Sequence, residues 1–129
     1  MEPYKILIAE DDRNIRAGVA DALELEGYIP VEAPDGGAAL RLYHEHHPDL
    51  LLLDIRMKDM SGLDAAQQIL QKHPSARILL LTTFSDDEYI VKALRIGTKG
   101  YLLKQDYAHI TPAIRAVYDG QTVFGDEIV

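Results

Sequence analysis

Two apolar segments of the chain each end in acidic residues. The run Leu50 to Leu53 is followed by Asp54, and the apolar run Tyr4 to Ala9 is followed by Glu10-Asp11-Asp12. If both segments are neighbouring parallel strands, their carboxyl ends bring these carboxylates together at one edge of a sheet. Clustered carboxylates repel one another and retain protons unless a cation joins them. The pattern therefore predicts a site for a hard metal ion, with Asp54 able to act as a nucleophile.

The elements that must position these groups alternate along the chain. Three of five strand-like segments are almost wholly apolar, which is typical of strands covered by helices on both faces. We expect strands at 4–9, 28–33, 49–53, 77–82 and 100–103. The helices between them are expected to end at Gly27, before Pro48, before Pro74, near Gly97 and near Asp119-Gly120. Expected helix starts are Asp35-Gly36-Gly37, Gly62, Ser85-Asp86-Asp87-Glu88 and, for the last, Asp106 or near Pro112.

This alternation with short connections predicts an α/β fold with right-handed crossovers. We expect a doubly wound five-stranded parallel sheet with strand order 2-1-3-4-5, the flavodoxin-like (βα)5 arrangement. Pro30 cannot donate a hydrogen bond to a central ladder, so it puts the second strand at the sheet edge, in agreement with that order. Strands one and three are then neighbours, and ligands bind beyond their carboxyl ends.

Composition bounds the function. The 129 residues fit one domain with a sizeable core, and the absence of cysteine excludes disulfides and thiolate metal sites. A formal net charge of −8 argues against this domain itself gripping a nucleic-acid backbone. The sequence has neither an apolar stretch long enough to span a bilayer nor an amino-terminal signal pattern, so we expect a cytoplasmic protein without membrane contact.

Two further residues with suitable chemistry follow the last predicted strands. Thr82 closes the fourth strand and Lys104 follows the fifth. Two or three carboxylates with water suit Mg²⁺, which prefers oxygen ligands in octahedral geometry. The Asp54 carboxylate can attack phosphorus, while a lysine neutralises charge on the phosphoryl oxygens and a threonine hydroxyl hydrogen-bonds one of them. Together these groups predict a phosphoryl acceptor.

Several motifs resemble those of the response-regulator receiver domain of two-component signalling. They are Glu10-Asp11-Asp12, the stretch DIRMKDMSGL at 54–63, Thr82-Thr83 and GTKGYLLK at 97–104. The segments LLLTTFSDDEYIVKAL and AIRAVYDGQTVFGDEI are similar to the NarL/FixJ subfamily, whose members carry a carboxyl-terminal LuxR-type helix-turn-helix. The resemblance covers essentially the whole chain.

The resemblance implies a role for each residue of the site. Asp54 would be the phosphorylation site, and Asp11 and Asp12 would hold Mg²⁺ together with Asp54 and the backbone carbonyl of Arg56. Lys104 would contact the phosphate. Such a domain is a signalling phosphoacceptor that catalyses only its own phosphoryl transfer and dephosphorylation.

The resemblance also implies how the domain signals. Thr82 and Tyr101 would form the switch pair that reshapes the surface of the fourth helix, fifth strand and fifth helix. The phosphoryl donor would be a sensor histidine kinase, and the phosphorylated form would dimerise and control transcription through a DNA-binding domain outside this chain. We therefore expect a receiver domain at 1–121 and the start of a linker at 122–129. A stand-alone receiver that acts by protein contact is the alternative.

The sequence departs from the family pattern at two positions. Lys58 stands where most members have proline, so the loop after Asp54 loses a fixed φ and gains a cation near the site. Gln105 follows Lys104, so the Lys-Pro step of some relatives is absent. Neither change removes a required group.

Other interpretations of the same residues are possible. Asp11 or Asp12 could serve only as a helix cap. A flavin-binding flavodoxin would need Ser, Thr and Gly after the first strand, where the acidic cluster would repel the flavin phosphate. A Mg²⁺-dependent phosphohydrolase would need a second carboxylate two residues after Asp54, where Arg56 stands. Three histidines near the end of the second predicted helix could suggest a transition metal, but surface positions are expected for them: His44, His46 and His47.

Overall fold

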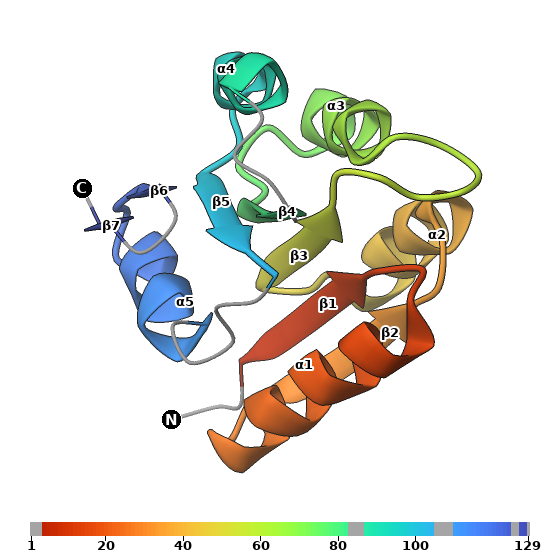
Figure 1. Ribbon diagram of the computed structural model, residues 1–129, viewed down its shortest axis with the longest axis vertical. Helices are drawn as coiled ribbons and strands as arrows, with labels where there is room; N and C mark the ends of the chain where they lie inside the picture. Colours follow the sequence, from red (N-terminus) through yellow and green to blue (C-terminus); the bar gives the residue numbers. More distant parts are fainter. Residues whose placement is uncertain (1–3, 83–86, 105–109, 125–126, 129) are drawn as a thin grey trace.

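Strands and helices alternate along the chain in the computed structural model, which describes residues 4–82, 87–104, 110–124 and 127–128 (Figure 1). The elements, in order, are β1 Lys5–Ala9, α1 Arg13–Leu25, β2 Ile29–Ala33, α2 Gly36–His46, β3 Leu50–Asp54, α3 Gly62–Lys72, β4 Ile78–Thr82, α4 Asp87–Ile96, β5 Gly100–Leu103, α5 Ile110–Tyr118, β6 Val123–Phe124 and β7 Glu127–Ile128. All five strands predicted from the sequence are confirmed, each to within one residue at either end.

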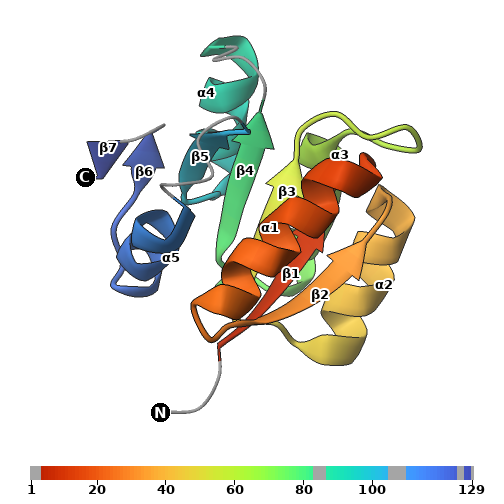
Figure 2. The ribbon, with the colours of Figure 1, turned by 60° about the horizontal axis from the view of Figure 1, so that its bottom comes forward.

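The strand order follows the prediction and then extends it. The sheet runs β2-β1-β3-β4-β5-β6-β7, so its first five strands have the order 2-1-3-4-5, and they pair in parallel. β2 stands at one edge, where Pro30 is tolerated. At the other edge β6 pairs with β5 in parallel and β7 pairs with β6 in antiparallel fashion (Figure 2). These two strands have two residues each, too few for a period-2 pattern in the sequence, and they lie within the predicted linker segment 122–129.

Helices cover both faces of the sheet. Figure 1 shows α1 and α5 on one face and α2, α3 and α4 on the other. Strand side chains alternate between these layers: Ile6 and Ile8 join the core on the α1 and α5 side, while Leu7 joins the core on the α2, α3 and α4 side. A strand buried on both faces needs apolar residues at consecutive positions, which accounts for the near-continuous apolar runs in the sequence.

The helix starts agree with the sequence where the structure describes them. Asp35 caps α2 and accepts a hydrogen bond from Ala38 N at 2.7 Å, and α3 begins at the predicted Gly62. The predicted caps at Ser85-Asp86 and Asp106 lie outside the described residues, as do Thr83 and Gln105. None of the helices in the described part of the chain is long and apolar enough to cross a membrane.

Candidate functional site

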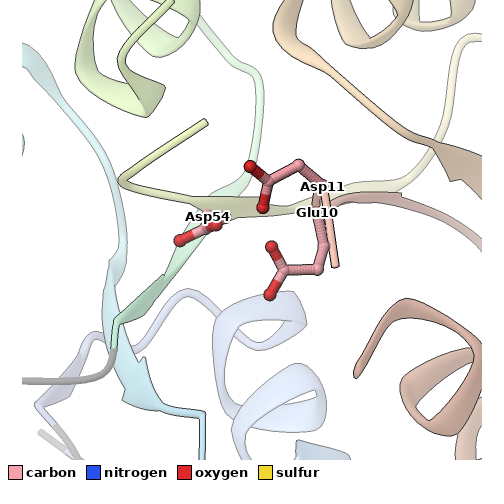
Figure 3. A group of neighbouring side chains, drawn as sticks. All are labelled: Glu10, Asp11 and Asp54. Carbon is pink, nitrogen blue, oxygen red and sulfur yellow. The ribbon is translucent and has the colours of Figure 1, made fainter. Parts of the chain in front are cut away.

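The register of β1 and β3 brings acidic residues together. Ala9 pairs with Leu53, so Glu10 and Asp54 are the next residues at the carboxyl ends of two neighbouring strands. Figure 3 shows the side chains of Glu10 and Asp11 extending toward Asp54. Each of the three residues offers one carboxylate oxygen, and these oxygens all lie within 4.8 Å of one another. The predicted acidic site at this sheet edge is therefore present.

The ammonium group of Lys104 lies between two of these carboxylates. Its Nζ is 2.6 Å from Glu10 Oε1 and 3.1 Å from Asp54 Oδ2. The backbone supports this position, because Lys104 N donates to the Thr82 carbonyl at 2.8 Å beyond the end of β5. Glu10 is 0% and Asp54 2% exposed, so the lysine compensates negative charge that water does not reach.

Burial and charge together set the protonation of these groups. Burial raises the pKa of Glu10 and the neighbouring Asp54 raises it further, whereas Lys104 opposes both. Burial alone would lower the pKa of Lys104, but its contacts with Glu10 and Asp54 outweigh that effect and raise the pKa. The lysine therefore stays positively charged at neutral pH.

One ammonium group faces a cluster of three carboxylates, and this leaves the site short of positive charge. Glu10 Oε2 is buried and has no hydrogen-bond partner among the described residues. A buried carboxylate oxygen without a partner is costly unless a cation or a proton compensates it. Oxygen donors of this kind, at this spacing, fit a small divalent cation such as Mg²⁺.

Asp12 lies directly before α1 and caps that helix. Its Oδ1 accepts hydrogen bonds from Asn14 N at 2.9 Å and Ile15 N at 3.0 Å, so Asp12 is the N-cap of α1. The carboxylate oxygens that lie within 4.8 Å of one another belong to Glu10, Asp11 and Asp54, so Glu10 stands beside two members of the predicted set Asp11, Asp12 and Asp54. The metal-binding role of Asp12 stays a prediction. The capping alternative for Asp12 describes the observed geometry. The sequence signal for this capping role is the position of Asp12 directly before Arg13, the first residue of α1, because aspartate is a favoured N-cap residue.

Two other predicted residues lie near Asp54. Thr82 is buried at the end of β4, one residue beyond Leu81, which is the partner of Asp54 in the β3–β4 register. Arg56 N donates to Asp54 Oδ1 at 3.2 Å, so the backbone after the strand helps to orient the carboxylate.

Tyr101 lies farther along the sheet, on β5. It is half-buried and packs against the core on the α2, α3 and α4 side. Its ring meets the ring of Phe124 in β6 edge-on, with centroids 6.4 Å apart and an interplanar angle of 72°. The segment after α5 therefore touches the residue that the family resemblance makes a switch.

The loop between β3 and α3 returns close to the strand it leaves. Gly62 N donates to the Ile55 carbonyl at 2.7 Å, and a Cβ at Gly62 would collide with the backbone carbonyl of Asp54. At the tip of the loop, Asp59 accepts hydrogen bonds from the amides of Gly36 and Gly37, and these bonds lower the pKa of Asp59. Sequence reasoning missed Asp59, because no local pattern links it to amides more than twenty residues away.

The three histidines lie at the carboxyl end of α2. His44 and His47 are exposed, and their ring centroids are 6.3 Å apart. His47 ends the helix in the left-handed region, with φ at 46°. Within the described ranges, the one group of three or more residues suited to a metal ion is Glu10, Asp11 and Asp54.

Comparison with known proteins finds related sequences along nearly the whole chain. Residues 6–115 match the sequence model of the family described as response regulator receiver domain. The chain is 34% identical over 130 residues to the response regulator protein VraR of Staphylococcus saprophyticus, covering 98% of this chain and 62% of that protein. It therefore spans less than two thirds of the length of that relative.

Solved structures show the same likeness. A two-component response regulator of the LuxR family from Aurantimonas sp. SI85-9A1 superposes with a TM-score of 0.88 at 33% identity, over 94% of this chain and 89% of that one. A CheY-like response regulator receiver domain protein from Methanospirillum hungatei superposes with a TM-score of 0.87 at 26% identity, over 92% and 96% of the two chains.

Proposed function

Because the chain belongs to the response regulator receiver domain family, we propose that it is a phosphorylation-dependent switch whose phosphoacceptor is Asp54. The observation that carries the proposal is the position of Asp54: it is buried at a strand end, with Lys104 Nζ 3.1 Å from Oδ2 and two more carboxylates beside it. This is the charge arrangement that phosphoryl transfer to a carboxylate needs, since a cation must offset charge on the nucleophile and on the incoming group.

Glu10, Asp11 and Asp54 would hold Mg²⁺, together with the backbone carbonyl of Arg56. The unpartnered Glu10 Oε2 and the spacing of the three carboxylates support this assignment. Bound Mg²⁺ supplies positive charge that offsets the charge on the transferring phosphoryl oxygens. Asp12 is left out of the set because its Oδ1 accepts two amide hydrogen bonds at the start of α1.

The chemistry of the transfer falls to this chain's own groups. An Asp54 carboxylate oxygen attacks the phosphorus of a phosphohistidine on a sensor kinase; the P–N bond breaks, and the imidazole leaves and takes up a proton. Arg56 N holds Oδ1, which orients the carboxylate for in-line attack. Lys104 stays charged and contacts the phosphoryl oxygens, while the burial of Asp54 limits access of bulk water.

The added charge would then act on Thr82 and Tyr101. An aspartyl phosphate carries about two negative charges where the carboxylate carried one. Thr82, buried at the end of the adjacent strand, would move to hydrogen-bond it, and Tyr101 would turn into the space that is vacated. The surface of α4, β5 and α5 would change shape as a population shift, limited by the difference in phosphoryl affinity between the two states.

The output is proposed from the relatives. This chain spans 62% of the length of VraR, and a solved relative is a response regulator of the LuxR family. We infer that the phosphorylated domain forms a homodimer and controls transcription through a DNA-binding domain joined to it by a linker that starts at 122–129. We also infer that the protein acts in the cytoplasm. The alternative is a receiver that acts alone through protein contacts. The formal charge of −8 argues in either case against direct contact between this domain and DNA.

The proposal is tested with a small-molecule phosphoryl donor. The chain is incubated with acetyl phosphate and Mg²⁺, and its intact mass and oligomeric state are measured with and without EDTA. We expect a gain of one phosphoryl group that needs the metal, accompanied by dimer formation. An unchanged mass would contradict the phosphoacceptor role. A phosphorylated chain that stays monomeric would contradict the dimer and leave the phosphoacceptor role standing.

A further inference from the structure

The loop between β3 and α3 is joined to helix α2 by one side chain. Asp59 Oδ1 accepts a hydrogen bond from Gly36 N and Oδ2 accepts one from Gly37 N, each at 2.9 Å. These amides open α2, and amides in the first turn of a helix have no partner within it. The helix also has a cap of its own, because Asp35 accepts from Ala38 N. The first three amides of α2 therefore donate to two carboxylates. Asp35 directly precedes the helix, whereas Asp59 belongs to the distant loop between β3 and α3.

Close packing of the loop accompanies these hydrogen bonds. A Cβ at Gly36 would collide with the side chain of Met60, and one at Gly37 would lie 3.5 Å from Asp59 Oδ2. Met60 itself packs against the core on this side of the sheet. The lack of a side chain at Gly36 thus lets the loop approach the start of α2, and the hydrogen bonds to Asp59 hold the loop in that position.

The same loop is tied to the phosphoacceptor at its base. Arg56 N donates to Asp54 Oδ1 at 3.2 Å, and Arg56 and Ser61 form an antiparallel bridge across the loop. Gly62 N then donates to Ile55 O as the chain enters α3. The tip, at Lys58 and Asp59, extends beyond these ties. The side chains of Lys58 and Asp59 are exposed, so the hydrogen bonds of Asp59 to α2 and the packing of the neighbouring Met60 hold the tip against the rest of the fold.

We propose that Asp59 is a positioning residue: by capping α2 from the loop, it holds the loop in the shape that presents the Arg56 carbonyl to Mg²⁺ beside Asp54. It supplies the restraint that a fixed proline φ would otherwise supply at position 58, where this chain has lysine. The inference rests on the proposed function of the Asp54 site and adds to it a residue that touches neither metal nor phosphate. Hydrogen bonds from Gly36 and Gly37 lower the pKa of Asp59, so its carboxylate stays ionised and favours the positive end of the helix dipole.

The chain offers a matched control for this role. Asp35→Ala and Asp59→Ala each remove one carboxylate cap from the start of α2, but only Asp59 belongs to the loop. The dissociation constant for Mg²⁺ is measured by calorimetry on the wild-type chain and both variants. We expect Asp59→Ala to weaken Mg²⁺ binding about tenfold, the scale seen when an indirect support of a metal ligand is lost, while Asp35→Ala stays within about twofold of wild type.

Two further variants, Lys58→Pro and Lys58→Ala, separate position from charge, because both remove the lysine cation and only proline fixes the loop φ. In the Asp59→Ala background, Lys58→Pro restrains the loop without restoring the carboxylate, and we expect it to recover most of the lost Mg²⁺ affinity, well beyond any gain in Lys58→Ala. A loss that Lys58→Pro does not recover, or that Lys58→Ala recovers equally well, would show that Asp59 acts through its charge, and this would overturn the positioning role. Equal losses in Asp59→Ala and Asp35→Ala would overturn it as well, because they would trace to α2 alone.

Failure of this role can be told apart from failure of the proposed function. A wild-type chain that binds Mg²⁺ and is labelled by acetyl phosphate, with an Asp59→Ala variant of unchanged affinity, rejects the role of Asp59 and keeps that of Asp54. A wild-type chain that does not bind Mg²⁺ rejects both.

Discussion

Lys104 contacts Glu10 more closely than it contacts Asp54, with Nζ–O distances of 2.6 Å and 3.1 Å. Glu10, fully buried, therefore takes a large share of the compensation that the lysine offers. Through this contact Glu10 holds the ammonium group beside Asp54. The site is a buried network of charges in which each member restrains the others.

Replacing Lys104 with methionine should destabilise the fold. The change leaves Glu10 and Asp54 buried without their cation, and removing one partner of a buried ion pair costs about 3–5 kcal/mol. Urea denaturation in EDTA measures the loss. Excess Mg²⁺ should raise the midpoint of Lys104→Met more than that of wild type, because bound cation replaces part of the missing charge. An unchanged midpoint in EDTA would contradict this view of the network.

Removing the Asp12 side chain should affect stability and not metal binding. Asp12→Ala loses the N-cap of α1, which costs about 1 kcal/mol, and it should leave Mg²⁺ affinity near the wild-type value. Glu10→Gln keeps the cap and should weaken Mg²⁺ binding, because a carboxylate of the cluster becomes neutral. Calorimetric titration of both variants decides the question. Strong loss of Mg²⁺ binding in Asp12→Ala, with little in Glu10→Gln, would contradict a ligand role for Glu10 and support the set predicted from the sequence, Asp11, Asp12 and Asp54.

Two glycine-to-alanine changes should act in opposite directions. At Gly62 a Cβ meets the Asp54 carbonyl, so Gly62→Ala must shift the backbone next to Asp54 and should cost about 1–3 kcal/mol. At Gly18, within α1, a Cβ meets nothing within 4 Å, and Gly18→Ala should stabilise the chain by about 0.5–1 kcal/mol. Thermal unfolding compares them. Equal effects of the two substitutions would argue against the close return of the loop.

Tyr4 should titrate at high pH. Burial raises the pKa of Tyr4 to about 12, and the nearby Arg77 opposes the shift. A pKa raised on folding means that the contribution of Tyr4 to stability is complete below pH 10 and is lost as the pH rises from about 10 toward about 12. Absorbance titration of the native chain should therefore show a late tyrosine that is missing in Tyr4→Phe. Its appearance near pH 10 in the native wild type would contradict the buried setting of Tyr4.

The sheet was predictable because its signals are strong and local. Apolar runs such as Leu50 to Leu53 identify the strands, and Pro30 identifies the edge. The strands β6 and β7 were not predictable, because two residues carry no periodicity and their pairing depends on the edge of β5. The glycine at position 100 is the one sequence signal for the β5–β6 contact. Its φ is +123°, and a Cβ there would collide with the Val123 carbonyl, so only glycine fits where β6 packs against β5.

Some features of the site could likewise be predicted from the sequence and others could not. The positions of Asp54 and Lys104 follow from strand ends, so the topology brings them together without further information. The choice between Glu10 and Asp12 depends on where β1 stops and α1 starts, a boundary that shifts by a residue or two in any reading of periodicity. The contact of Asp59 with α2 joins segments 22 and 23 residues apart, and only the folded chain shows it.

The central claim, that Asp54 is the phosphoacceptor, is tested most directly by the intact mass of two proteins. Wild type and Asp54→Asn are incubated with Mg²⁺ and acetyl phosphate, and their melting curves establish that both are folded. We expect one phosphoryl group on the wild type, mapped to the peptide that contains Asp54, and none on the variant. A label on Asp54→Asn, or a wild-type label on another peptide, would contradict it.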